Sequence, residues 1–267
     1  AGMYALRNGW GVNDIYFALH CSPPGLSSHD QPDNGTFELY AHGRWLMNDT
    51  GYYTYGHDSE LRNWHRQTRV HQTLTLDNRD SEIQGKHLLW QSAPGFDVVA
   101  VENAAYPGLI HRRTVWFVDR AFFVVLDEAI GDAPGTLDLH FQFAPGEVRM
   151  DIPGNRVFTR FDDANVLVAS ASDISLEEEE GWTACEYGSR ETRKAVRFSH
   201  AQPAPAAFLT LIVPYKGNTP PEVAATFSPT FQPGAALAEV QAKAFDKSWT
   251  LRRDLATGDA SVRAVQD

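Results

Sequence analysis

Side chains that can bind metal ions or transfer protons are concentrated between residues 29 and 77 of the sequence. Five of the ten histidines lie in this part of the chain, namely His29, His42, His57, His65 and His71. Gln31, Asp49 and His71 supply an amide oxygen, a carboxylate and an imidazole, all of which are known metal ligands. If the fold brings these three together, they could bind one divalent ion. Otherwise they make ordinary hydrogen bonds on the face of a sheet.

Basic residues surround one tryptophan in the same region of a chain whose net charge is −11. The cluster consists of Arg62, Trp64, His65, Arg66 and Arg69. Arginine binds carboxylate and sulfate in a bidentate manner, and tryptophan offers a flat apolar face to a sugar ring. The cluster therefore indicates a site for an anionic sugar, with a solvated loop around one packed tryptophan as the alternative. Three nearby tyrosines extend this platform or form cross-strand aromatic pairs, namely Tyr52, Tyr53 and Tyr55.

Composition narrows the class of protein. Hydrophobic residues make up 43% and charged residues 21% of the 267 positions, which is typical of a globular chain. The acidic balance argues against binding to duplex nucleic acid, and no apolar run is long enough to predict a membrane span. Cys21 and Cys185 match no zinc motif and cannot form a disulfide framework. The first residues show neither the basic nor the apolar region of a signal peptide.

Short β-branched and aromatic runs alternate with turn residues along nearly the whole chain, which predicts a large antiparallel β-sandwich over residues 1–267. The runs Thr114–Val118 and Ala121–Leu126 are apolar on both faces and predict a hairpin in the middle of the sandwich. In Arg69–Asp77, Val70, Leu74 and Leu76 fall on one face, so we expect a half-buried strand whose other, polar face carries His71. Only Pro233–Lys247 has a composition that allows a short helix.

Several ordered pieces of the sequence resemble the C-terminal β-sandwich domain of heparinase II/III-type polysaccharide lyases, nearest to the heparin-sulfate lyase heparinase III. The first pieces are the opening segment Gly2–Arg7 and the pattern His29-x-Gln31-x-Asp33-x-Gly35-x-Phe37. The later pieces are Asp49-x-Gly51, Val70–Thr73, His111-x-Arg113 and Phe123–Asp127. Together they extend over about half of the chain in the family's order.

The resemblance implies a specific chemistry. These lyases cleave the bond to O4 of a uronic acid by β-elimination, and a sandwich histidine that matches His29 joins the acid/base machinery. It also implies one divalent metal bound within the sandwich, with Gln31, Asp49 and His71 as ligands. Many relatives have a second histidine where Gln31 stands. Because an amide oxygen is a harder ligand than an imidazole, its presence favours zinc less and calcium or manganese more. Arg62, Trp64, His65 and Arg66 are the expected substrate contacts.

The sequence departs from the full enzymes of this family in one respect. They carry an N-terminal (α/α) toroid that supplies a catalytic tyrosine and an asparagine, and no such helical region is seen here. We therefore expect the chain to need a toroid domain from the same or another polypeptide and to be poorly active alone. The expected partner is an acidic polysaccharide, and the family's usual location is the periplasm or outside the cell. Two alternatives stay open: a non-catalytic carbohydrate-binding or structural sandwich, and a lyase for alginate or another uronate polymer.

Overall fold

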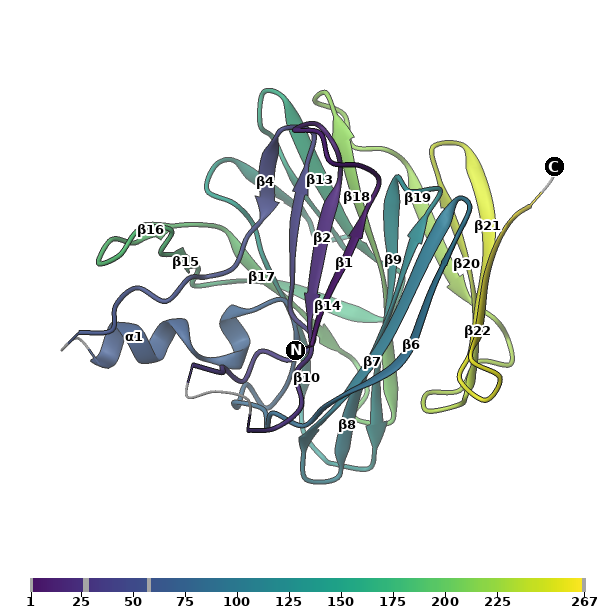
Figure 1. Ribbon diagram of the computed structural model, residues 1–267, viewed down its shortest axis with the longest axis horizontal. Helices are drawn as coiled ribbons and strands as arrows, with labels where there is room; N and C mark the ends of the chain where they lie inside the picture. Colours follow the sequence, from purple (N-terminus) through teal and green to yellow (C-terminus); the bar gives the residue numbers. More distant parts are fainter. Residues whose placement is uncertain (1, 26–28, 57–58, 266–267) are drawn as a thin grey trace.

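Layers of antiparallel β-sheet make up nearly all of the chain that the computed structural model describes, residues 2–25, 29–56 and 59–265 (Figure 1). The central layer is an eight-stranded sheet. In spatial order its strands are β11 (Val148–Asp151), β12 (Arg156–Thr159), β13 (Ala164–Ser170), β18 (Ala206–Lys216), β9 (Phe122–Gly131), β8 (Leu109–Val118), β7 (Phe96–Tyr106) and β6 (Gly85–Ala93). The fold class is therefore all-β and antiparallel, as predicted.

Two four-stranded sheets cover one face of the central sheet. The first contains β1 (Met3–Arg7), β2 (Tyr16–His20), β3 (Phe37–Ala41) and β4 (Arg44–Met47). The second contains, in spatial order, β14 (Ile174–Glu179), β17 (Ala195–His200), β10 (Leu137–Gln142) and β5 (Leu74–Leu76). A third four-stranded sheet packs on the opposite face and contains β19 (Val223–Phe227), β20 (Leu237–Ala244), β21 (Lys247–Asp254) and β22 (Asp259–Ala264).

The predicted central hairpin is confirmed, and its composition explains the layering. β8 and β9 are antiparallel neighbours, and the turn that connects them contains Asp119 and Arg120, both of which have positive φ angles. Alternate residues enter two different cores, because successive side chains of a strand point to opposite faces. Val115 and Phe117 belong to the core beneath β1–β4, whereas Trp116 belongs to the core beneath β19–β22.

Stacked phenylalanines join the outer sheet to the central one. The ring centroids of Phe17 and Phe37 are 4.6 Å apart, and those of Phe17 and Phe123 are 4.5 Å apart. Phe117 continues the stack at 4.4 Å from Phe123. Offset aromatic pairs at this spacing stabilise a core beyond the area that they bury. The stack therefore fixes β2 and β3, whose ends lead into the candidate site, against the rigid central hairpin.

Two local predictions were wrong. The segment Pro233–Lys247 contains no helix; it forms β20 and the following turn, because Ala238, Val240 and Ala242 alternate into the core against the central sheet. The predicted strand Arg69–Asp77 is a 3-10 turn η1 (Thr68–Val70) followed by the short β5, and the whole of residues 70–76 is buried.

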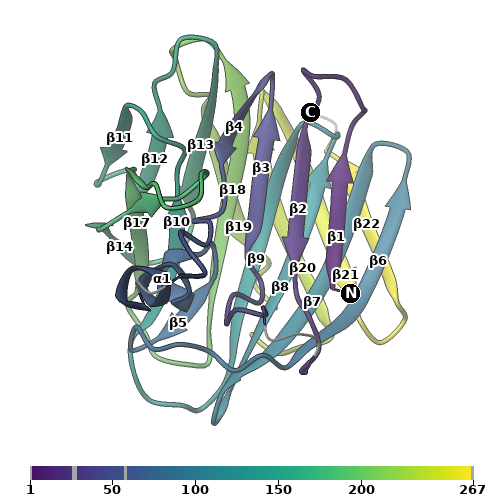
Figure 2. The ribbon, with the colours of Figure 1, turned by 60° about the vertical axis from the view of Figure 1, so that its left-hand side comes forward.

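One short helix was not predicted. α1 (Ser59–His65) projects on the side of the molecule away from β19–β22 (Figure 1), in front of the sheet that contains β10 and β17 (Figure 2). The two-stranded sheet of β15 (Trp182–Thr183) and β16 (Glu191–Thr192) projects on the same side. Among the described residues no helix is long and apolar enough to cross a membrane.

Candidate functional site

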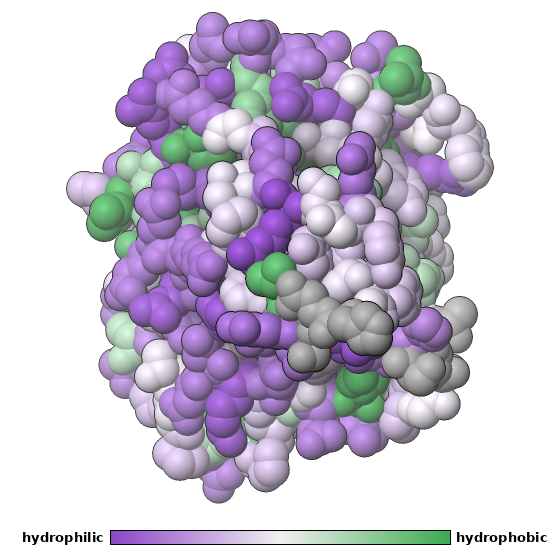
Figure 3. Space-filling model, turned by 90° about the vertical axis from the view of Figure 1, so that its left-hand side faces the viewer, coloured by the Kyte–Doolittle hydropathy of each residue, from purple (hydrophilic) through white to green (hydrophobic). Residues whose placement is uncertain are grey.

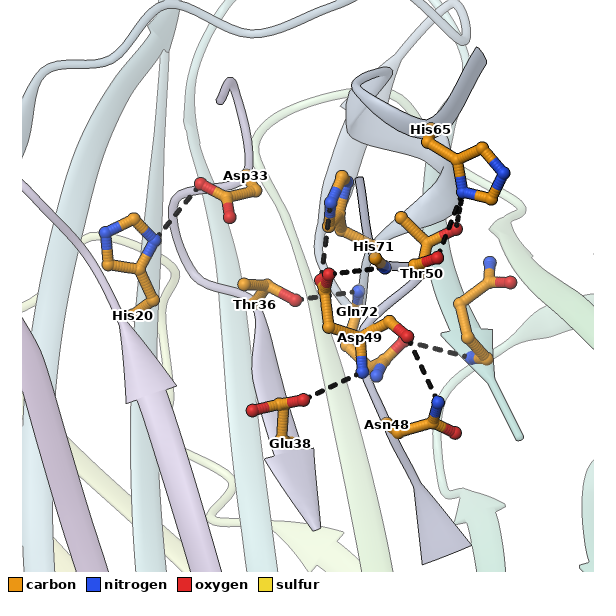
Figure 4. A network of polar contacts seen from close by, with 12 residues as sticks. His20, Asp33, Thr36, Glu38, Asn48, Asp49, Thr50, His65, His71 and Gln72 are labelled. Carbon is orange, nitrogen blue, oxygen red and sulfur yellow. Dashed lines mark hydrogen bonds and ion pairs between the residues drawn. The ribbon is translucent and has the colours of Figure 1, made fainter. Parts of the chain in front are cut away.

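The predicted ligand Asp49 stands just after β4, on the first loop of the candidate site (Figure 4). Its backbone N–H donates to Glu38 Oε1 at 3.0 Å, and its own Oδ1 accepts from the backbone N–H of Gly51 at 2.7 Å. Its other carboxylate oxygen, Oδ2, lies 3.4 Å from Nε2 of His71. The carboxylate is therefore held in one orientation, with Oδ2 directed at the imidazole.

His71 follows η1 and has the geometry of a metal ligand. Its Nδ1 lies 2.8 Å from the carbonyl oxygen of Gln67. Because a carbonyl can only accept, Nδ1 carries a proton, and in the neutral ring Nε2 then presents a lone pair. Nε2 is buried and has no hydrogen-bond donor among the described residues. A backbone carbonyl that fixes the tautomer in this way is typical of metal-binding histidines.

Asp49 Oδ2 and His71 Nε2 are thus two acceptors that face each other, an arrangement that a shared cation stabilises. Two ligands about 2.0–2.1 Å from one tetrahedral ion are roughly 3.4 Å apart, and the separation also suits the longer bonds of calcium. No cluster of three His, Cys, Asp or Glu side chains that could hold a metal exists in the described part of the chain. A site here therefore needs the predicted amide ligand as well.

Gln31 supplies a buried amide oxygen that is likewise without a donor in the described structure. The backbone on both sides of it is fixed: the carbonyl of Asp30 accepts from Arg66 Nη2 at 2.7 Å, and that of Pro32 accepts from Thr68 Oγ1 at 2.6 Å. Its segment therefore lies against residues 66–68, which lead directly to His71. Orphaned buried acceptors on Gln31 and His71, together with the Asp49 carboxylate, suit a hard or borderline divalent ion.

His29 is exposed, and an aromatic cluster connects it to two of the predicted arginines. Its ring meets the ring of Tyr55 edge-on at 5.7 Å, and Tyr55 stacks on Tyr52 at 4.3 Å. The hydroxyl of Tyr52 accepts hydrogen bonds from Arg62 Nη2 and from Arg66 Nη1, the latter at 2.7 Å. The structure thus brings the predicted catalytic histidine and part of the predicted anion site into one cluster.

Trp64 and His65 are less exposed than His29. Trp64 is half-buried, and the guanidinium of Arg69 lies 5.9 Å from its ring centre. His65 has no exposed surface; its Nδ1 lies 3.0 Å from the carbonyl oxygen of Thr50 and 2.9 Å from its hydroxyl. Burial lowers the pKa of His65 to about 4, so the ring is neutral at physiological pH. The expectation that His65 contacts substrate is therefore corrected: it anchors the loop that follows Asp49.

Arg193 is a site residue that sequence reasoning missed. Its Nη1 donates to the carbonyls of Asn48, at 2.6 Å, and of Asp49, at 3.3 Å. Burial lowers its pKa to about 10, which leaves the guanidinium charged at neutral pH. Arg193 reaches the loop from a segment more than 140 residues away, and no local pattern in the sequence marks it.

Asp49 also lines a cleft of about 750 Å³ on this side of the molecule. Its lining combines polar side chains with apolar ones; the polar side chains include Glu38, Arg44, Asn48 and Glu191, and the apolar ones include Trp45, Ala144 and Pro145. The face of the molecule from which α1 and β15–β16 project is predominantly hydrophilic (Figure 3). A cleft that combines polar groups with one exposed aromatic side chain suits a ligand that has both polar groups and an apolar face, such as a sugar ring.

The comparisons with known proteins point to one family. The family model described as heparinase II/III-like, C-terminal, matches residues 1–227. The heparin-sulfate lyase of Pedobacter heparinus is 39% identical over 233 residues, which are 84% of this chain and 35% of that protein. The heparin-sulfate lyase of Bacteroides stercoris is 33% identical over 90% of this chain and 38% of that protein.

Solved structures agree with the sequence relatives. The crystal structure of heparan sulfate lyase HepC from Pedobacter heparinus superposes with a TM-score of 0.89 at 35% identity, covering 96% of this chain and 41% of that one. A crystal structure of heparinase III gives a TM-score of 0.88 at 33% identity and covers 95% of this chain and 41% of that one. The chain therefore spans well under half the length of the relatives that it matches.

Proposed function

Because this chain belongs to the heparinase II/III-like family, we propose that it is the β-sandwich part of a polysaccharide lyase that cleaves a heparan sulfate-like glycosaminoglycan by β-elimination. The observation that carries the proposal is the similarity to heparin-sulfate lyases over most of the chain. The cluster of His29, Tyr52 and Arg66 supports it, because these groups match the requirements of the reaction.

In β-elimination a base removes the weakly acidic C5 proton of the uronate, and an acid protonates the departing O4. An exposed imidazole can take part in either transfer, and we assign that role to His29. The developing negative charge must be stabilised. We assign to Arg62 and Arg66, which both contact Tyr52, the attraction of uronate or sulfate groups towards His29, and to Trp64 a further substrate contact. The remaining acid/base and carboxylate-binding groups belong to the rest of the catalytic cleft.

We propose that an (α/α) toroid domain, from the same or another polypeptide, supplies that other half of the cleft. The relatives are more than twice as long as this chain, which supports the proposal. General acid/base groups contribute about 10²–10⁴-fold each, far less than a complete enzyme requires. The 267-residue chain should therefore form little or no product from heparan sulfate, whereas the chain joined to its toroid should produce unsaturated uronate, measured by its ultraviolet absorbance. Absence of product from the joined protein would reject the lyase assignment.

We further propose that Gln31, Asp49 and His71 hold one divalent ion, with calcium, zinc and manganese as the candidates. The bound ion would organise the loops around the cleft. Removing it with EDTA should lower the melting temperature by about 5–10 °C, because an ion at 100 times its Kd contributes about 2.7 kcal/mol and each kcal/mol is worth about 2–4 °C. The measurement is a thermal melt with and without EDTA, beside an elemental analysis of the purified chain.

The replacement His71→Ala should abolish the EDTA-dependent shift. As a control, His200→Ala should leave it intact, because that imidazole lies on β17 and its Nδ1 contacts the local backbone at Gln202. An unchanged wild-type melt in EDTA, with no ion in the elemental analysis, would contradict the metal assignment.

A further inference from the structure

A buried cluster of charges lies beneath the candidate metal site and consists of His111 and Arg113 on β8 and Asp127 on β9. Arg113 donates from Nε to Asp127 Oδ1 at 2.6 Å and from Nη2 to Asp127 Oδ2 at 3.1 Å. His111 Nε2 contacts the same Oδ1 at 2.6 Å. Although burial favours the neutral acid, the guanidinium of Arg113 holds the pKa of Asp127 below its usual range. The cluster is therefore an ion pair at neutral pH.

The remaining nitrogen of Arg113 points away from Asp127 and towards two loops. Nη1 donates to the carbonyl of Gly35 and to the carbonyl of Gln72, the latter at 2.6 Å. Gln72 follows the candidate ligand His71 directly, and Gly35 lies four residues after the candidate ligand Gln31. One guanidinium thus joins the two segments that carry these ligands.

The two segments are also joined directly to each other. Thr73 Oγ1 donates to the carbonyl of Asn34 at 2.7 Å, and the N–H of Gln72 donates to Thr36 Oγ1 at 3.1 Å. Gly35 has a φ of +92°, and a Cβ atom there would come within 2.9 Å of Thr73 Oγ1 and 3.0 Å of the His111 ring. Only a glycine permits so close an approach of the loop to this cluster.

The geometry points to Arg113 as a positioning residue of the candidate metal site. Held and neutralised by Asp127, it fixes the carbonyls of Gly35 and Gln72 and so sets the separation of the segments that carry Gln31 and His71. This inference rests on the proposed metal site for its functional consequence. Its structural content, that Arg113 orders these two segments, stands on the hydrogen bonds alone.

A matched control lies on the opposite face of β9, where that strand packs against β21 (Lys247–Asp254). Glu128, the neighbour of Asp127 on β9, points to the opposite face of the sheet, where its Oε2 accepts from Arg253 Nη2 at 2.8 Å. Both side chains are fully buried. Removing this pair perturbs the central sheet to a similar degree but touches neither ligand segment.

The test uses the 267-residue chain with the double variants Arg113→Met, Asp127→Asn and Arg253→Met, Glu128→Gln. Affinity for calcium, zinc and manganese chloride is measured by titration calorimetry, and hydrogen exchange is followed over residues 31–37 and 67–73. The Arg113 variant should bind the ion about 10–100-fold more weakly, which is the usual loss when residues that hold metal ligands in place are replaced. Its backbone amides should also exchange faster in these two segments. The Arg253 variant should match wild type in both measurements.

Wild-type affinity and exchange in the Arg113 variant, or equal losses in the Arg253 variant, would overturn the inference. If the double variant does not fold, Arg113→Lys replaces it, since lysine keeps the charge against Asp127 but loses the bidentate fork. If the wild-type chain binds none of the three ions, the metal proposal fails, whereas the exchange comparison still decides whether Arg113 orders the two segments.

Discussion

Replacing His29 with alanine, in a polypeptide that joins this chain to its toroid domain, should lower kcat on heparan sulfate by about 10²–10⁴-fold. That is the range over which a positioned acid or base acts. His29 is exposed and meets the ring of Tyr55 edge-on, and truncating an exposed side chain usually changes the free energy of unfolding by no more than about 0.5 kcal/mol. The measurement is steady-state formation of unsaturated uronate, with a thermal melt of the same preparation.

His87→Ala is a suitable control for that experiment. His87 is also exposed and packs on a tyrosine, with its ring 5.5 Å from that of Tyr4, but it lies on β6 and outside the candidate site. It should retain wild-type kcat. A His29→Ala enzyme within a few-fold of wild type would remove His29 from the acid/base machinery and would favour a role in binding.

The change Arg253→Met should lower the free energy of unfolding by about 3–5 kcal/mol, because it leaves the Glu128 carboxylate buried without its partner. Burial already raises the pKa of Glu128 despite Arg253. The folded variant should therefore retain a proton at a pH where the unfolded chain has lost it, so its deficit should grow as the pH rises from acid to neutral. Urea unfolding at several pH values measures both effects.

Two companion variants separate charge burial from simple loss of an ion pair. Adding Glu128→Gln to Arg253→Met should recover most of the stability, because no unpaired charge then remains in the core. Lys247→Met breaks the exposed pair with Asp119, whose atoms are 3.3 Å apart, and should cost less than about 1 kcal/mol. Equal costs for the buried and exposed single changes would show that burial of the charge is not the cause.

The sequence by itself determined the fold class and the central hairpin. Strands that are apolar on both faces, such as Thr114–Val118, require cover on both sides, and the structure provides it with a sheet on each face of β8 and β9. It also determined the family, since the motifs around His29, Asp49 and His71 occur in the family's order.

The sequence did not determine the local conformation where a segment's composition was compatible with both a helix and a strand. Residues 237–244 contain alanines that favour a helix, yet alternate residues such as Ala238 and Val240 bury one face of a strand. Pairing with β21 on one side and β19 on the other satisfied the backbone there, and tertiary context overrode propensity. Residues 71–73 form a bend instead of the predicted strand, and burial of all three residues removes the expected polar surface.

Only the tertiary structure decided how the candidate residues divide into roles. It left His29 exposed, buried His65 beneath the loop after Asp49, and oriented the free lone pair of His71 towards the Asp49 carboxylate. It also brought in Arg113 and Arg193, whose hydrogen bonds to the site loops join residues 41 to 145 positions apart. Local sequence patterns report the periodicity of a strand, whereas the neutralisation of a buried charge depends on which distant backbone groups the fold places beside it.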